Sequence, residues 1–204
     1  MRAYDLEITG SLKVQGDISA ENYIVDTTVT RMTQSFASGS TIFGDSGDDT
    51  HQFTGSLFIS GSRIHFDDKK YGTKLGYDAG LNTGTGTENT YIGYGAGKGG
   101  SGNDAYNTGI GSFALYAITD GNSNVAMGID VGTALTTGDD NMLIGRQAGN
   151  TMTGTSKTIL IGRSAGTAIN STDADGTIAI GYNAGAAITD GQYNTVIGYT
   201  AADS

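Results

Sequence analysis

A short apolar–glycine phrase recurs along the chain from residue 72 onward, and the spacing of its copies limits the possible folds. Successive glycines of this phrase lie 17, 18, 17, 17, 17, 19 and 17 residues apart. A fixed short period of this kind indicates a repeat architecture. We call these residues the anchor glycines: Gly76, Gly93, Gly111, Gly128, Gly145, Gly162, Gly181 and Gly198.

The residues around each anchor predict a strand followed by a bend. A large apolar residue precedes every anchor, and the position two residues earlier shares its side of an extended strand. We therefore interpret these two columns, represented by Ile159 and Ile161, as the face toward the core. Three residues after the anchor comes a small residue, and then Gly in six of eight repeats, which suits a bend with positive φ. Apolar residues seven positions past the anchor predict a second strand or a buried corner.

Polar turns rich in Gly, Asn, Asp and Thr separate the repeats. Insertions of one and two residues, near 99–106 and 170–176, fall in these turns, where they leave a core undisturbed. An Asn stands four residues before the anchor in several repeats, and we predict that these side chains form a hydrogen-bonded ladder between stacked coils. The predicted ladder residues are Asn89, Asn107, Asn124, Asn141 and Asn194.

These patterns favour an all-β fold, a parallel β-solenoid or β-roll of about eight 17-residue coils over residues 71–204. A helical solenoid would need longer units and fewer glycines. Eight coils at a strand spacing of about 4.8 Å would stack to roughly 40 Å. Residues 1–70 carry two similar alternating units, TGSLKVQG (9–16) and TGSLFISG (54–61), and predict a separate β-rich attachment or shaft region built of short strands.

The column two residues before the anchor bears on assembly. Its side chains point away from the predicted core, yet most of them are apolar, whereas a thin isolated solenoid would place polar residues there. Apolar residues on both faces imply a second buried surface, and we expect a homotrimer that packs this face around a common axis. The column consists of Tyr91, Gly109, Ala126, Leu143, Leu160, Ala179 and Val196.

Three units resemble a known kind of repeat: NTYIGYGAG (89–97), NVAMGIDVG (124–132) and NTVIGYTAA (194–202). They look like the head repeats of YadA-like trimeric autotransporter adhesins, and the resemblance covers about residues 72–202. It implies a left-handed parallel β-roll with three chains side by side in an adhesive fibre. Segments within residues 8–62 resemble tail-fibre and related virion proteins of tailed phages, which implies attachment to another virion or tail protein.

Composition excludes several other classes. The chain has 34 glycines but no proline and no collagen period, and it has no cysteine for disulfides or thiolate metal sites. A net charge of −10, spread along the chain, disfavours nucleic-acid binding. No apolar run reaches the length of a signal peptide or a membrane span. We therefore expect no membrane insertion, and either a protein that is not secreted by the usual route or a chain that is not the precursor.

Residues for catalysis are few, and we expect no enzyme activity, no cofactor and no metal. Neither His51 nor His65 belongs to a known metal or triad motif. Paired acids could serve glycoside hydrolysis, but in Gly-rich turns we interpret them as turn residues. The GGSGND segment (99–104) resembles the calcium-binding nonapeptide of RTX proteins, but it occurs once, whereas such a calcium site needs adjacent copies. The acid pairs are Asp48/Asp49, Asp67/Asp68 and Asp139/Asp140.

The column directly after the anchor is the candidate contact surface. Stacked coils would align its aromatic and basic side chains into a strip. One interpretation is a receptor strip that docks sugar rings by stacking and hydrogen bonding; the other is a ladder that stabilises neighbouring coils. The strip, with Ser112 and Ile129 completing the column, consists of Tyr77, Tyr94, Arg146, Arg163, Tyr182 and Tyr199.

Together these features predict a non-enzymatic, homotrimeric tail fibre or fibre-like virion protein that contacts a host-surface glycan or protein. Alternatives are a trimeric adhesin of the bacterial cell surface, a glycan depolymerase, and an ice-binding solenoid, which would need a regular flat array of Thr. The last repeat breaks off after its small residue. We therefore expect a partner, a following domain or trimer closure to cover residues 195–204, or a chain that is incomplete.

Overall fold

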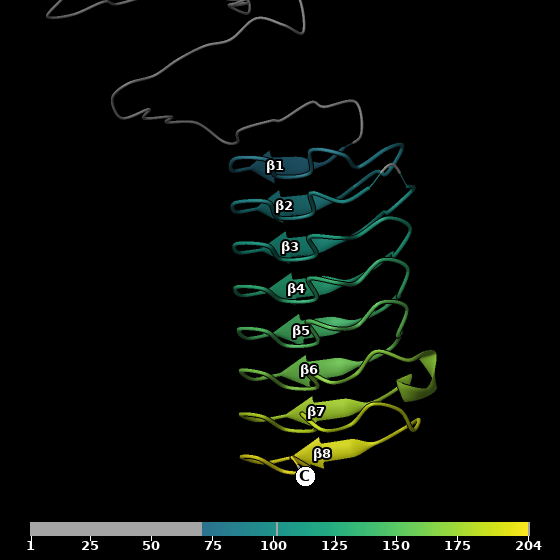
Figure 1. Cartoon of the computed structure of the whole chain (residues 1–204). Helices are drawn as coiled ribbons and strands as arrows, with labels where there is room; N and C mark the ends of the chain where they lie inside the picture. Colours follow the sequence, from purple (N-terminus) through teal and green to yellow (C-terminus); the bar gives the residue numbers. More distant parts are fainter. Residues whose placement is uncertain (1–70, 101, 204) are drawn as a thin grey trace, which may run out of the picture. The chain divides into compact units, whose positions relative to one another are not determined.

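The computed structural model describes residues 71–100 and 102–203, and these residues form a β-solenoid. Eight three-residue strands stack into one parallel sheet in chain order, through about seven turns (Figure 1). Each strand ends directly before an anchor glycine. The strands are β1 (Thr73–Leu75), β2 (Thr90–Ile92), β3 (Thr108–Ile110), β4 (Val125–Met127), β5 (Met142–Ile144), β6 (Ile159–Ile161), β7 (Ile178–Ile180) and β8 (Thr195–Ile197). The predicted all-β solenoid is confirmed.

The predicted division of the chain at residue 70 stays a prediction. Residues 1–70, with both TGSL units, His51, His65 and two of the three acid pairs, lie outside the described residues.

The two insertions leave the strand register intact. Thr90 pairs with Thr108 across the first insertion, and Ile159 pairs with Ile178 across the second. The longer insertion forms the short 3-10 helix η1 (Thr172–Ala174), where the Ser171 hydroxyl accepts a hydrogen bond from the backbone N–H of Asp173. The turns thus absorb the extra residues, as the repeat spacing predicts.

The core lies on the opposite face of the strands from the one that we predicted. The middle residue of each strand points inward, and Tyr91, Leu143 and Leu160 are fully buried. The flanking residues, predicted to be core, line the outer face instead, where Met127 is 41% and Ile197 66% exposed. A period of two shows which side chains share a face, but with apolar residues on both faces it does not show which face is inside.

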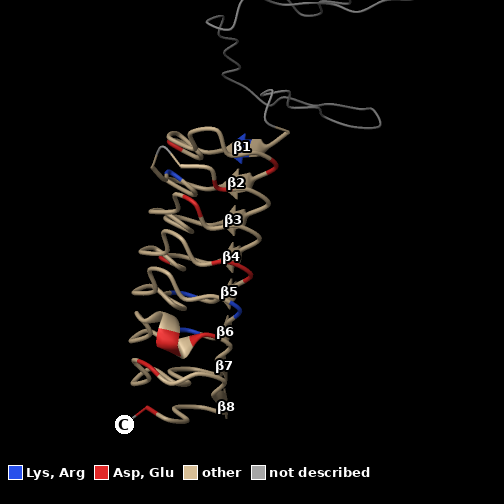
Figure 2. Ribbon diagram, turned by 90° about the vertical axis from the view of Figure 1, so that its right-hand side faces the viewer, with Lys and Arg blue, Asp and Glu red and all other residues tan. Residues whose placement is uncertain are grey.

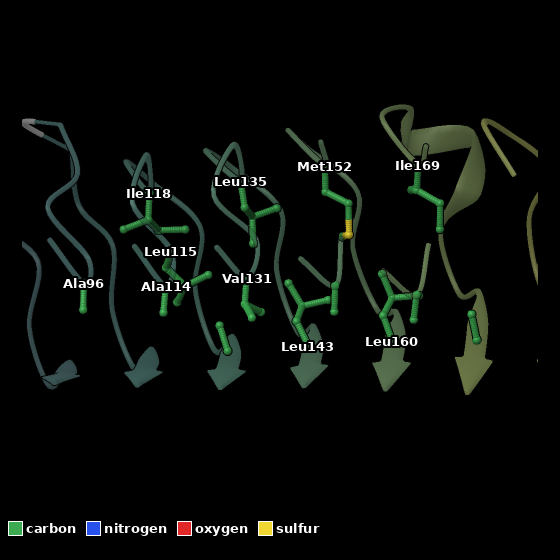
Figure 3. Packing of buried hydrophobic residues seen from close by; sticks show 14 of the residues in the cluster. Ala96, Ala114, Leu115, Ile118, Val131, Leu135, Leu143, Met152, Leu160 and Ile169 are labelled. Carbon is green, nitrogen blue, oxygen red and sulfur yellow. The ribbon is translucent and has the colours of Figure 1, made fainter. Parts of the chain in front are cut away.

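The rest of the interior comes from the bend that follows each strand. The small column lies inside, where Ala114, Ala148 and Ala165 are fully buried. The apolar column seven residues past the anchor is also buried, and Figure 3 shows Ile118, Leu135, Met152 and Ile169 in one row above Leu143 and Leu160. No strand forms at that column among the described residues, so it is a buried corner rather than a second strand.

The anchor glycines allow the coils to approach at backbone distance. Gly162 has a φ of +135°, and a Cβ atom placed on it would lie 2.2 Å from the carbonyl oxygen of Gly181 in the next coil. Four residues past the anchor, the predicted positive φ is also found. Leu115 and Ala202, which replace glycine in that column, both adopt a φ of +52°. The fold therefore imposes the bend, and glycine lowers the steric cost of the positive φ.

The predicted Asn ladder is confirmed from Asn89 to Asn141. The Asn124 Oδ1 atom accepts a hydrogen bond of 3.1 Å from the backbone N–H of Asn141, and its Nδ2 atom donates to the Gly138 carbonyl at 2.8 Å. Thr158 continues the ladder by donating its backbone N–H to Asn141 Oδ1. These bonds satisfy backbone groups that the three-residue strands leave without a ladder partner. Asn194 departs from the pattern, because its side chain donates to Gly191 and Thr177 instead.

Replacing an anchor glycine should therefore destabilise the solenoid. Gly162→Ala places a methyl group against the Gly181 backbone at an unfavourable φ, and we expect a loss of about 1–3 kcal/mol in the free energy of unfolding. Gly154→Ala is the matched control, since the nearest atom to its Cβ is the terminal Oγ1 of Thr137 at 3.3 Å. Denaturant unfolding measures both variants; equal losses would contradict the close-approach explanation.

Candidate functional site

The candidate strip lies at the corner that follows each strand. Each of its residues directly follows an anchor glycine, so all six occupy equivalent places on different coils. All six residues are exposed, and the exposed fraction of the four tyrosines ranges from 37% for Tyr182 to 76% for Tyr199. The structure thus aligns the predicted residues into one column, interrupted at β3 and β4 by Ser112 and Ile129.

Near the first coils the strip is aromatic. The Tyr77 and Tyr94 rings stack with centroids 5.8 Å apart and planes 10° apart, and Phe113 meets the Tyr94 ring edge-on at 5.1 Å. Lys98 lies beside this cluster and forms an ion pair with Asp78 at 2.8 Å. The Asp78 hydrogen bond raises the pKa of Lys98 above its usual value.

Near the last coils the strip combines cations and rings. The Tyr182 and Tyr199 rings stack at 5.1 Å with planes 12° apart, and the Arg163 guanidinium lies 5.6 Å from the Tyr182 ring centroid. Arg146 occupies the same place one coil earlier. Basic segments in these coils stand out beside β5 and β6 in Figure 2.

These contacts support the ladder interpretation of the strip. Because the rings stack on one another at coil spacing, neighbouring coils already occupy ring faces that a sugar would use. Such aromatic pairs stabilise adjacent coils by about 0.5–1.5 kcal/mol each. A role in receptor binding stays a prediction, and it would rest on the exposed ring edges and the arginines.

The outer face of the sheet is a second apolar surface, and it differs from the one that the sequence predicts. It is formed by the first and last residue of each strand, and its apolar members run without interruption from β4 to β7. Met127 and Met142 are 41% and 40% exposed there, and the isoleucines are half-buried or exposed. A second apolar surface was predicted, but on the middle column, which is the core. We call this surface the outer apolar face: Leu75, Ile92, Ile110, Val125, Met127, Met142, Ile144, Ile159, Ile161, Ile178, Ile180 and Ile197.

A buried polar group that the repeat pattern did not reveal lies inside the first coils. The Tyr91 hydroxyl donates a 2.7 Å hydrogen bond to Asp104 Oδ2, and Asn89 Nδ2 donates to the same oxygen at 3.0 Å. The second carboxylate oxygen, Oδ1, is buried without a partner. Tyr91 fits because Gly97 and Gly109 leave room: a Cβ on either would lie within 3.0 Å of its ring.

Burial sets the electrostatics of this pair. Burial is the main cause that raises the pKa of Asp104, and hydrogen bonding to Tyr91 only partly opposes it. Burial also raises the pKa of the Tyr91 hydroxyl, with the nearby Asp104 charge adding to the effect, so the phenol stays protonated and donates. The signal for this group in the sequence is weak: a Tyr in an aliphatic column and an Asp within the one-residue insertion.

The remaining acid candidates within the described residues have structural roles. Asp139 Oδ1 accepts a 2.7 Å hydrogen bond from the backbone N–H of Asn122, and Asp140 adopts a φ of +58° in the same turn. Asp104, in the segment that resembles a calcium repeat, points to Tyr91. In residues 71–100 and 102–203 there is no group of three or more His, Cys, Asp or Glu side chains that could hold a metal ion.

Comparison with protein-family models, curated proteins and solved structures found no match to this chain. A β-solenoid of this kind is consistent with a fibre or adhesin-like structural protein. Within the part of the chain that the structure describes, no helix has the length and apolar character needed to cross a membrane.

The Asp104 geometry predicts a pH effect on stability. A folded-state pKa above the unfolded value of 3.8 means that Asp104 favours folding most at pH values below 3.8. This contribution is lost as the pH rises through the folded-state pKa. Asp104→Asn removes the titration while keeping an acceptor for Tyr91.

We therefore expect the free energy of unfolding of Asp104→Asn, relative to the wild type, to increase between pH 4 and pH 7. Denaturant unfolding of both proteins at several pH values measures this difference. The contributions of the other titratable groups cancel, because both proteins contain them. A difference that is constant or falls with pH would contradict the proposed burial of the charge.

Proposed function

We propose that this chain is a non-enzymatic structural protein, a homotrimeric segment of a tailed-phage tail fibre or a similar virion protein. The observation that carries the proposal is the outer apolar face, which the isolated chain leaves partly in contact with water. A long apolar surface on a β-solenoid is typical of an interaction surface.

The form of this face favours another copy of the same chain as its partner. Its apolar rows repeat at the strand spacing of about 4.8 Å. A second ladder with the same spacing can match such rows coil by coil, and an identical chain provides one. Closed symmetry is the usual arrangement for soluble homo-oligomers. The number three comes from the resemblance of the repeats to YadA-like head repeats.

The phage assignment and the virion location come from the resemblance of residues 8–62 to tail-fibre proteins. In such a fibre, the N-terminal region would attach to another virion or tail protein, and the solenoid would face the host surface. A trimeric adhesin of the bacterial surface remains the alternative, since it would use the same solenoid.

A charge on the outer apolar face should break the assembly. The full chain, of 20.9 kDa, should have three times that mass in solution by light scattering. Ile161→Lys brings three like charges together in an apolar interface, and we expect this variant to dissociate to the mass of one chain. Asn170→Lys, an exposed change of the same charge on the turn that follows β6, should remain trimeric.

A wild-type chain that is monomeric or dimeric would contradict the proposed trimer. So would an Ile161→Lys variant that keeps the wild-type mass, because the outer apolar face would then not be the interface. Circular dichroism of both variants separates dissociation from unfolding.

Electron microscopy of the virion tests the location. Antibodies raised against residues 71–204 should label the tail or its fibres in purified phage particles. Labelling of bacterial cells that lack any phage, with none on particles, would contradict the virion assignment and support the surface-adhesin alternative.

A further inference from the structure

We propose that Arg146, Arg163, Tyr182 and Tyr199, the arginine–tyrosine patch, bind a polysaccharide that carries carboxylate groups. This inference rests on the proposed function as a host-contacting fibre, and it names the chemistry of the ligand at one part of the strip.

The two arginines lie side by side on neighbouring coils. The Ser164 N–H donates a 2.9 Å hydrogen bond to the Arg146 carbonyl, which fixes Arg163 one coil from Arg146. At the corresponding strand spacing of about 4.8 Å, like charges repel each other and destabilise a sheet. Both side chains are exposed, and neither has an ion-pair partner among residues 71–100 and 102–203. Arg163 gains a stabilising contact with the Tyr182 ring, but fold stability does not explain why a second arginine stands beside it on the neighbouring coil.

The local charge contrasts with that of the whole chain. The net charge is −10, yet the column directly after the anchor contains no acid in any of the eight coils. Two of the five Lys and Arg residues in 71–204 belong to this column. On this acidic protein, the two arginines therefore form a local positive surface that attracts anions.

The neighbouring tyrosines hold one arginine in place. With its guanidinium 5.6 Å from the Tyr182 ring centroid, and Tyr182 stacked on Tyr199, Arg163 is restricted before any ligand arrives. A guanidinium that is positioned in advance binds a carboxylate with two parallel hydrogen bonds and loses less entropy on binding. Tyr199, which is 76% exposed, adds ring surface and a hydroxyl group for the sugar.

The spacing of the patch favours a uronic-acid chain. A pyranose ring is similar in length to one coil spacing, so a polymer with one carboxylate on each sugar carries its charges close enough together for one chain to supply a carboxylate to each of the two flexible arginine side chains. A neutral glycan would leave the guanidinium pair without a partner. Nucleic acid is a poorer fit, because its backbone needs a broad basic surface that a chain of this charge does not offer.

Binding of the full-length protein to immobilised polygalacturonate tests the proposal, with fully methyl-esterified polygalacturonate as the uncharged probe of the same shape. We expect binding to the acid form alone, weakened by added salt. Arg163→Gln should reduce the affinity about tenfold or more through loss of a charge-assisted pair. Lys157→Gln, which removes the same charge from the other end of β6, should bind as the wild type does.

Tyr182→Ala combined with Tyr199→Ala should also weaken binding while leaving the oligomeric mass unchanged. No binding to polygalacturonate at low salt, equal binding to its methyl ester, or equal losses in Arg163→Gln and Lys157→Gln would each overturn the proposal. Tighter binding to single-stranded DNA than to polygalacturonate would overturn it as well. Failure of the trimer itself would show separately, as a wild-type mass below three chains.

Discussion

The close contact between anchor glycines on successive coils is the constraint on which the rest of the solenoid depends. At six of the first seven anchors a Cβ atom would collide with the backbone of the next anchor, and at Gly128 it would lie 3.0 Å from that backbone. Because glycine has no side chain, the strands can pair at normal sheet distance directly before a sharp bend. Because the bend is repeated at every coil, equivalent side chains fall into columns, and the strip, the Asn ladder and the outer apolar face all follow from this stacking.

A thin solenoid obtains its stability from ladders rather than from a large core. The coils from β4 to β7 each contribute one middle strand residue, one small corner residue and one apolar corner residue to the interior, although Ile188, the corner residue after β7, is only partly buried. Three-residue strands supply few hydrogen bonds, so side chains such as Asn124 complete the pairing between turns. In repeat architectures stability comes mostly from contacts between neighbours. The Tyr and Arg stacks on the strip are therefore structural even where they also contact a ligand.

The Tyr91–Asp104 pair shows how the repeat tolerates a local exception. The inserted residue in the second turn accompanies an acid at a buried position where other coils have Gly, Thr or Ala, and the Tyr91 hydroxyl reaches it. The ring fits only because two neighbouring positions are glycine. In this coil a hydrogen-bonded polar pair replaces apolar packing, and the charge of the Asp104 carboxylate is costly to bury.

The repeat, the strand positions, the bends, the turns that absorb insertions and most of the Asn ladder can all be predicted from the amino-acid sequence. Each of these depends on local spacing or on the conformational demands of a single residue such as Gly162. The sequence also shows that both faces of most strands are apolar. Which face is inside depends on the folded chain, since alternation is symmetric between the two faces of a strand. The bend after each anchor brings Ala165 and Ile169 to the side of Leu160, and this places Ile159 and Ile161 on the outside. The pairing of Tyr91 with Asp104 was likewise decided by folding, because it joins residues of two coils that no repeat column connects.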